Sequence, residues 1–246
     1  GSEMCIRDRI TAGANQKPNE TRLDLVQKNA KIMTDVVTQI KEQEYKGILL
    51  IVSNPVDIMT QVAMEVSGFP EHRVFGSGTV LDSARLRYHL GQHLGVDSRS
   101  VHAFVIGEHG DSEIAAWSSA NVSGVPLNSF CEMRGHFNHE GNTESIEEQV
   151  KNSAYEIIAK KDATYYGIAM VVKRICQAIV RDEKSIFPIS LRMHGEYALE
   201  DVVLSMPAIV GARGIETTIP ISLDEKEVSR LHESAEMLRE TRKEIR

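Results

Sequence analysis

Apolar and polar positions follow one another along the chain in blocks that predict alternating helices and strands. Apolar residues recur every three or four positions from Leu23 to about Tyr45, which predicts an amphipathic helix. Residues 48–52 are continuously apolar, a pattern typical of a strand that is covered on both faces of a parallel sheet. Pro55 suits the first position of a second helix, which is expected to run to about Val66. Together these elements predict part of a doubly wound α/β sheet.

The rest of the chain predicts longer helices and a second group of strands. The expected elements are helices over 79–94 and 146–180 (with a break near Asp162), strands over 101–106, 187–193 and 202–210, a loop over 121–145 and a last helix from Glu225, capped by Ser222. We therefore expect a partial parallel sheet over residues 10–77 and an α+β domain over residues 78–246. Residues 1–9 are charged where a buried strand should begin, so we expect them to be a junction segment outside the fold.

Charge and composition exclude several classes of function. The 246 residues carry a net charge of -7 and no basic stripe, which argues against nucleic acid as a partner. No apolar run is long enough to span a bilayer, so no membrane partner is expected. The three cysteines are far apart, which argues against a disulfide framework and favours the reducing cytoplasm.

His109 is the strongest candidate for acid–base chemistry. It lies in Gly107-Glu-His-Gly-Asp111, directly after a predicted strand, and the two glycines allow a sharp turn and the close approach of a ligand. Histidine exchanges protons near neutral pH, so this placement favours a catalytic group. A solvated loop histidine is the alternative, and the sequence leaves both open.

Asp82 and Arg85 are three residues apart and therefore share one face of an otherwise apolar helix. The carboxylate could orient a histidine, and the guanidinium could bind a substrate carboxylate. An ordinary intrahelical ion pair is the alternative, and spacing alone slightly favours it. Arg22, at the start of a helix where the dipole disfavours a cation, hints at a separate role.

Two further patterns carry no site. Gly76-Ser77-Gly78 resembles the start of a dinucleotide-binding loop, but no G-x-G-x-x-G occurs in these residues. Cys131, His136 and His139 have a loosely metal-like spacing without a matching second pair, so no metal is expected.

Five ordered motifs carry a resemblance to a known family. They are Ile10-Thr-Ala-Gly-Ala-Asn-Gln-Lys-Pro-Asn-Glu-Thr-Arg22, Val52-Ser-Asn-Pro-Val-Asp57, Gly76-Ser-Gly-Thr-Val-Leu-Asp-Ser-Ala-Arg85, Gly107-Glu-His-Gly-Asp111 and Ala163-Thr-Tyr-Tyr-Gly167. In this order the chain resembles the bacterial L-lactate dehydrogenases of the lactate/malate dehydrogenase family, from Ile10 to near its end. The resemblance implies a Rossmann-like dinucleotide-binding part followed by a substrate domain of the lactate dehydrogenase type.

The resemblance also implies an activity and its residues. It implies an NAD-dependent oxidoreductase of glycolysis and fermentation that interconverts pyruvate and L-lactate. His109 would be the general acid and base, Asp82 its orienting carboxylate, and Arg22 the lid arginine that stabilises charge on the carbonyl oxygen. The substrate would be bound by Gln16, Asn54, Arg85 and Thr164. The cofactor would lie near Gly13, Ala14, Val52, Ser53, Asn54 and Ser77.

Specificity and regulation follow from the same resemblance. Related malate dehydrogenases place arginine where this chain has Gln16, so the neutral amide favours pyruvate over oxaloacetate. Arg87 and His102 match positions where allosteric members bind fructose 1,6-bisphosphate between subunits, and a homotetramer is expected. Surface residues without such a role are the alternative at these two positions.

The chain also departs from the family pattern. The first strand, the glycine-rich turn, the first helix and the acidic residue that binds the adenosine ribose have no counterpart here, and Asp162 replaces a usual glycine. Weak cofactor binding and impaired activity are therefore expected. Two alternatives stay open: a catalytically dead fragment that self-associates, and a dehydrogenase of malate or another 2-hydroxy acid.

Overall fold

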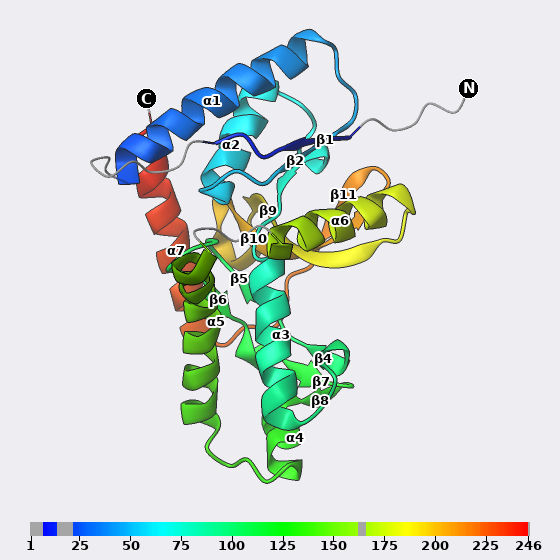
Figure 1. Ribbon diagram of the computed structural model, residues 1–246, viewed down its shortest axis with the longest axis vertical. Helices are drawn as coiled ribbons and strands as arrows, with labels where there is room; N and C mark the ends of the chain where they lie inside the picture. Colours follow the sequence, from blue (N-terminus) through cyan, green and yellow to red (C-terminus); the bar gives the residue numbers. More distant parts are fainter. Residues whose placement is uncertain (1–6, 14–21, 162–165, 246) are drawn as a thin grey trace.

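A six-stranded mixed sheet organises the protein. The computed structural model describes residues 7–13, 22–161 and 166–245 (Figure 1). The strand order in the sheet is β1-β2-β3-β9-β10-β11. The strands are β1 (Arg7–Ile10), β2 (Ile48–Ile51), β3 (Val74–Gly76), β9 (Ser185–His194), β10 (Glu200–Gly211) and β11 (Gly214–Thr218). The first three strands are parallel and the last three antiparallel, which agrees with the expected α/β class followed by an α+β part.

Strand β2 has the burial that its sequence predicts. All four of its residues are buried, because β1 and β3 flank it and helices α1 (Arg22–Glu42) and α2 (Val56–Ser67) pack against this part of the sheet. Helix α2 ends at Gly68, whose φ of 62° is a left-handed conformation that glycine adopts without strain. The predicted succession of helix, buried strand and helix is thus confirmed here.

The sheet begins earlier than the sequence predicts. Arg7, which we assigned to a junction segment, pairs with Ile48, and the parallel register continues to Ile10 opposite Ile51. Residues 7–9 therefore belong to β1, and the junction assignment is wrong for them. The charges of Arg7, Asp8 and Arg9 misled the prediction, because an edge strand needs backbone pairing on one side only and tolerates charged side chains.

The two parts of the sheet meet at one narrow crossing. Gly76, at the end of β3, forms a bridge with Ser190 of β9. A Cβ atom on Gly76 would lie 2.5 Å from the Thr60 hydroxyl oxygen and 2.8 Å from the Ser190 Cβ, so this position requires glycine. The expected boundary near residues 77–79 therefore lies where hydrogen bonding continues from one part into the other.

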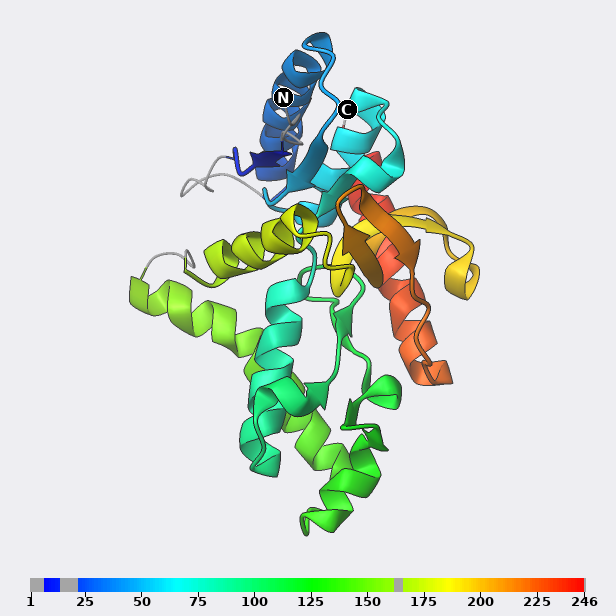
Figure 2. The ribbon, with the colours of Figure 1, turned by 90° about the vertical axis from the view of Figure 1, so that its right-hand side faces the viewer.

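In the described residues, four long helices follow β3 in the chain. They are α3 (Val80–Leu94), α5 (His139–Lys161), α6 (Tyr166–Val180) and α7 (Glu225–Lys243). Figure 1 shows α3 descending from the sheet beside α5, while α7 runs back upward so that the C-terminus ends near α1. Figure 2 shows α5 and α6 as two arms of an open angle. The predicted break between them falls at residues 162–165, outside the described part of the chain.

Four details of the second half differ from the sequence prediction. Residues 101–106 form two short strands in separate sheets, and residues 121–145 hold a hairpin and helices where we expected a loop. The short elements are β4 (Val101–His102), β5 (Val105–Ile106), β6 (Ile114–Ala115), β7 (Asn121–Val122), β8 (Val125–Pro126), α4 (Leu127–Met133) and 3₁₀ helices at 71–73, 98–100, 117–119 and 196–198. Strand β11 was not predicted, and the capping box of α7 joins Asp224 and Glu227. Most of these elements are only two to seven residues long, so their sequence periodicity is weak.

Two hydrophobic clusters hold these layers together. The larger one lies around the six-stranded sheet and includes Phe75 and Met206, while the smaller one joins α3, α4 and α5 through residues such as Leu90 and Leu127. In the described part of the chain, no helix is both long and apolar enough to cross a membrane.

Candidate active site

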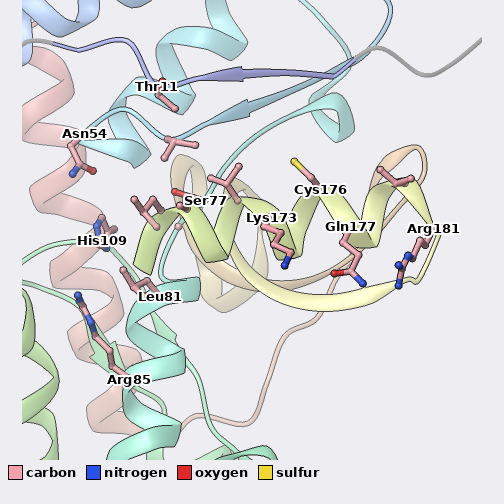
Figure 3. A pocket seen from close by; sticks show the side chains of 16 residues that line it. Thr11, Asn54, Ser77, Leu81, Arg85, His109, Lys173, Cys176, Gln177 and Arg181 are labelled. Atoms are coloured by element: carbon pink, nitrogen blue, oxygen red, sulfur yellow. The ribbon is translucent and has the colours of Figure 1, made fainter. Parts of the chain in front are cut away.

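A cavity of about 1300 Å³ opens at the carboxyl ends of the parallel strands. Thr11 follows β1, Asn54 follows β2 and Ser77 follows β3, and all three line the cavity. His109 and Arg85 line it as well, and the facing wall is α6 (Figure 3). Ligands of open α/β sheets bind outside the carboxyl ends of the strands, so the fold places this cavity where a ligand is expected.

The backbone around His109 is anchored by residues far away in the sequence. Gly107 exchanges two backbone hydrogen bonds with Ser205, at 2.9 and 2.8 Å. The Glu108 N–H donates to the Ser234 hydroxyl at 2.8 Å, and the His109 N–H donates to Asp57 Oδ2 at 2.7 Å. The loop therefore has one defined course, and His109 is not a freely solvated loop residue.

His109 and Asp82 form a hydrogen-bonded pair. His109 Nδ1 donates to Asp82 Oδ2 at 2.8 Å, and Asp82 Oδ1 accepts from Arg85 Nη1 at 3.0 Å. The Asp82 side chain is 5% exposed and that of His109 is 29% exposed, so the imidazole reaches the cavity while its partner is buried. The structure thus places His109, Asp82 and Arg85 in one hydrogen-bonded group, whereas their spacing in the sequence left their roles undecided.

The charges of this pair favour the imidazolium form. Burial disfavours a positive charge on His109, but the adjacent Asp82 carboxylate outweighs burial and raises the pKa of His109 to about 9. Burial opposes ionisation of Asp82 too, yet the charge and hydrogen bond of His109 hold its pKa below the usual range. A pKa of about 9 leaves the His109 imidazole mostly protonated at neutral pH.

Local backbone geometry places Asp82 in this position. Gly78 has a φ of 51°, and a Cβ there would lie 2.7 Å from the Pro188 carbonyl oxygen. The Thr79 N–H donates to the same carbonyl at 3.1 Å, and the Thr79 hydroxyl donates to the Val105 carbonyl at 2.5 Å. This turn starts α3, whose first turn contains Asp82, where the helix dipole stabilises a carboxylate.

Two carboxyl groups near His109 were missed by sequence reasoning. Asp57 is 1% exposed; its Oδ1 accepts from the Ser190 hydroxyl at 2.6 Å, and burial raises its pKa to about 6. Glu113 is 7% exposed, and burial raises its pKa to about 8, with a further contribution from Asp82. Of the two carboxyl groups, only Asp57 could have been found from the sequence, because it is a lone charge on an otherwise apolar stretch of α2.

Asp82, His109 and Glu113 also form the one group in the described residues that offers three potential metal ligands within 4.8 Å of one another. Two of these ligands already have partners, since Asp82 binds both the imidazole and Arg85. The Arg85 guanidinium 3.0 Å from the Asp82 carboxylate opposes a second cation there, which disfavours a metal ion at this group.

The residues expected around a dinucleotide lie in different positions. Val52, Asn54 and Ser77 line the cavity, but Ser53 and Gly13 do not appear in its wall. Ser53 is buried and its hydroxyl donates to the Ala12 carbonyl at 2.6 Å, so it ties β2 to the end of β1. Its effect on a cofactor would be indirect, through the backbone that it fixes.

Other expected site residues fall outside the described part or outside the cavity. Gln16, Ala14 and Thr164 are not described, nor is the side chain of Arg22, which begins α1. Arg87 donates to the Ala103 carbonyl at 3.2 Å, next to His102, which is exposed on β4. The Arg87 guanidinium thus contacts the backbone of the residue after His102, and neither side chain lines the cavity.

Comparisons with protein families agree over almost the whole chain. Residues 6–76 match the family model described as lactate/malate dehydrogenase, NAD binding domain. Residues 79–246 match the model described as lactate/malate dehydrogenase, alpha/beta C-terminal domain.

Curated relatives and solved structures are similar as well. An L-lactate dehydrogenase from Acetivibrio thermocellus is 48% identical over 98% of this chain and 75% of its own length. One from Thermoanaerobacterium saccharolyticum is 47% identical over 96% of this chain and 76% of its own length. The crystal structure of a minor L-lactate dehydrogenase from Enterococcus mundtii in the ligands-bound form has a TM-score of 0.93 and 42% identity, covering 98% of this chain and 76% of that one.

Proposed function

The chain belongs to the lactate/malate dehydrogenase family, and from this premise we propose that it interconverts pyruvate and L-lactate with NAD, with His109 as the proton donor and acceptor. The observation that carries the proposal is the 2.8 Å hydrogen bond between His109 Nδ1 and Asp82, in a cavity that Arg85 also lines. A 2-oxo acid needs a proton for its carbonyl oxygen and a cation for its carboxylate, and this wall supplies both.

His109 performs the proton transfer. Asp82 binds Nδ1, so the other ring nitrogen, Nε2, is the atom left to donate a proton to the substrate oxygen. Negative charge develops on that oxygen during reduction, and its basicity then exceeds that of the imidazole, so the proton moves only as the reaction proceeds. In lactate oxidation the neutral imidazole takes the same proton back, and Asp82 stabilises the imidazolium that results.

Arg85 and neighbouring residues bind and orient the substrate. The guanidinium is 14% exposed and holds Asp82 with Nη1, so its other N–H groups can bind a carboxylate at the cavity wall. Asn54 lines the same cavity and can donate its amide to the substrate oxygen. Arg22, Gln16 and Thr164 are proposed from the family resemblance to complete the site, as the lid cation and two substrate contacts.

The cavity fits the reactive end of the cofactor. Val52, Leu81, Ile168 and Val172 form apolar walls for a flat ring, and Thr11 and Ser77 offer hydroxyls at the ends of β1 and β3. We propose that these residues, with the backbone near Gly13, Ala14 and Ser53, hold NAD. When bound, the nicotinamide supplies or accepts the hydride at the substrate carbon.

Pyruvate-dependent oxidation of NADH tests this function directly. Removing the imidazole with His109→Asn should lower kcat by about 10²-fold or more, because general acid–base catalysis contributes that much. His72→Asn is the matched control, because His72 is exposed on a short 3₁₀ helix and does not line the cavity. Equal rates for the wild type and His109→Asn would exclude the proposed role.

We further propose that Gln16 makes pyruvate the preferred substrate. A buried carboxylate without a partner costs far more than a lost methyl contact, so Gln16→Arg should raise kcat/KM for oxaloacetate relative to pyruvate. An unchanged ratio would contradict this assignment and would leave a different 2-hydroxy acid as the second candidate.

Regulation, assembly and location complete the proposal. Arg87 bonds the Ala103 carbonyl, next to His102 in the sequence, and we propose that the two side chains bind a phosphate of fructose 1,6-bisphosphate at a two-fold interface of a homotetramer. The sugar bisphosphate should then lower the KM for pyruvate in the wild type but not in Arg87→Gln. Few, widely spaced cysteines and the family resemblance support the cytoplasm as the location.

A further inference from the structure

The Asn54 side chain depends on its backbone for its position. It is exposed and lines the cavity on the same side as His109 (Figure 3). In the described residues its amide makes no hydrogen bond of its own. Asn54 belongs to the turn between β2 and α2, where Ser53 precedes it and Pro55 follows it. Whatever fixes the backbone of this turn therefore fixes the direction of the amide that we propose to bind the substrate oxygen.

Asn29 of α1 binds this turn from below the cavity wall. Asn29 is 4% exposed, and its Nδ2 donates to the Asn54 carbonyl at 2.9 Å. In the described part of the chain no backbone N–H donates to that carbonyl, so Asn29 supplies its hydrogen bond. The donor is itself held firmly, because the neighbouring residues Val26, Ala30 and Met33 of α1 are buried in the core.

The same side chain faces the segment that follows β1. A Cβ on Gly13 would lie 3.6 Å from both Nδ2 and Oδ1 of Asn29, which is an ordinary contact distance. The Ser53 hydroxyl donates to the Ala12 carbonyl at 2.6 Å and so ties the turn after β2 to the segment after β1. Asn29 and Ser53 thus hold the ends of the two strands as one unit against α1.

We propose that Asn29 is a positioning residue for the reaction: by binding the Asn54 carbonyl, it aims the Asn54 amide at the substrate oxygen. The inference rests on the proposed function, because the direction of this amide matters only if a carbonyl oxygen is reduced beside it. Asn29 does not line the cavity, so it acts through Asn54. The alternative is a purely structural amide, whose loss would lower the stability without acting through Asn54.

Loss of the Asn29 side chain should affect kcat more than KM. Negative charge develops on the substrate oxygen during reduction, so a hydrogen bond from Asn54 stabilises the transition state more than the bound substrate. A displacement of about 1 Å can lower a rate by about 10²-fold, and the loss of one hydrogen bond behind the turn should displace Asn54 by less. We therefore expect Asn29→Ala to lower kcat for pyruvate reduction about tenfold and to change KM by less than about twofold.

A double-mutant cycle separates a positioning role from a structural one. Asn54→Ala should lower kcat by about 10²-fold, as the loss of a donor to a developing oxyanion does. If Asn29 acts through Asn54, then Asn29→Ala should change kcat by less than about twofold in the Asn54→Ala background. A further loss of about tenfold in the double variant would mean independent effects and would overturn the inference.

The variant Asn29→Asp tests the donor itself. Aspartate has nearly the shape of asparagine, but its ionised carboxylate can only accept hydrogen bonds. One of its oxygens would then face the Asn54 carbonyl without a bond, so kcat should fall at least as far as in Asn29→Ala. A wild-type kcat in Asn29→Asp would show that the Nδ2 donor is not needed, against the inference.

Amide hydrogen exchange gives a readout that does not need turnover. The Val52 N–H donates to the Ile10 carbonyl at 2.9 Å beside this turn, so exchange in residues 51–54 reports how firmly the turn is held. Exchange there should be about fivefold faster in Asn29→Ala than in the wild type, as the loss of one hydrogen bond predicts. Unchanged exchange would overturn the inference, whether or not the protein turns over. Faster exchange without pyruvate reduction in the wild type, or with full reduction in Asn54→Ala, would instead contradict the proposed function.

A matched variant controls for the loss of a side-chain amide. Asn121 of β7 also donates to a backbone carbonyl, that of Ser119 at 3.3 Å, and it does not line the cavity. Asn121→Ala should leave kcat, and exchange in residues 51–54, as they are in the wild type. A loss of kcat in Asn121→Ala equal to that in Asn29→Ala would show a general effect of removing such an amide and would overturn the inference.

Discussion

The two ends of the cavity are built in different ways. At the His109 end, polar groups from α2, α3, β9 and the loop bind one another at 2.6–3.0 Å, and the Asp82 side chain is only 5% exposed. At the other end, helix α6 presents Lys173 and Gln177, and Arg181, directly after α6, has a side chain that is 66% exposed (Figure 3). The hydrogen bonds at the first end fix the positions of the His109 and Asp82 side chains. The side chains at the second end only bound the cavity. Substitutions should therefore be costly at the first end and mild at the second.

The largest effect is expected at Asp82. Asp82→Asn keeps the shape but removes the charge that raises the pKa of His109 to about 9, so that pKa should fall well below its present value. At neutral pH less imidazolium is then available, and kcat for pyruvate reduction should drop by about 10²–10³-fold, with an alkaline limit at lower pH. A pH–rate profile of the variant checks both, and an unshifted limit would contradict the role of Asp82.

The next effect concerns the support behind His109. Asp57→Ala removes the acceptor of the His109 N–H and of the Ser190 hydroxyl, and it leaves a small cavity. An unpaired buried N–H and a cavity should together lower the free energy of unfolding by about 3 kcal/mol. Denaturant unfolding measures this. Because Asn can still accept from one group and donate to the other, Asp57→Asn should lose less, and an equal loss would point to the charge itself.

A smaller effect is expected at Gly78, beside the crossing of β3 and β9. Gly78→Ala places a Cβ against the backbone of β9, 2.7 Å from the Ser190 nitrogen, at a positive φ. The cost should be about 1–3 kcal/mol in thermal or denaturant unfolding. Gly13→Ala is the matched control, since its Cβ would meet only the Asn29 side chain at 3.6 Å, an ordinary contact. Similar losses of stability in both variants would show that the backbone of β9 leaves room for a Cβ atom at position 78.

The smallest effect is expected at Arg181, which directly follows α6. Arg181 is exposed, and its ion pair with Glu183 spans 3.9 Å, so Arg181→Ala should change stability by less than about 0.5 kcal/mol. The pH dependence of kcat should also stay as it is in the wild type. A shift in that dependence would remove the distinction between the two ends.

The sequence predicts the regular parts of the fold well and the tertiary contacts poorly. The apolar run of β2 and the glycine that ends α2 follow from residue patterns, and both are confirmed. Helix α4 was missed because only Leu127 and Cys131 of its seven residues are buried, which gives little periodicity. Residues 7–9 were missed because the pairing of an edge strand does not depend on apolar side chains.

The candidate site was likewise only partly predictable from the sequence. The spacing of Asp82 and Arg85 indicated a shared helix face, but only the structure joins that face to His109, 27 residues from Asp82 in the sequence. Glu113 had no detectable signal, since the charged groups around it come from distant segments, namely α3, α5 and α7. Gln16 and Thr164 lie outside the described residues, so their roles stay predictions.

The anchoring of the His109 loop has a consequence for the order of folding. The partners of this loop lie 52 residues before it, at Asp57, and 126 residues after Glu108, at Ser234. Contacts at such separation form slowly, because much of the chain must be ordered before they close. During synthesis, α2 and α3 can form early, but the loop can reach its final course only when α7 has left the ribosome. The acid–base chemistry proposed for His109 would thus be among the last properties that a growing chain acquires.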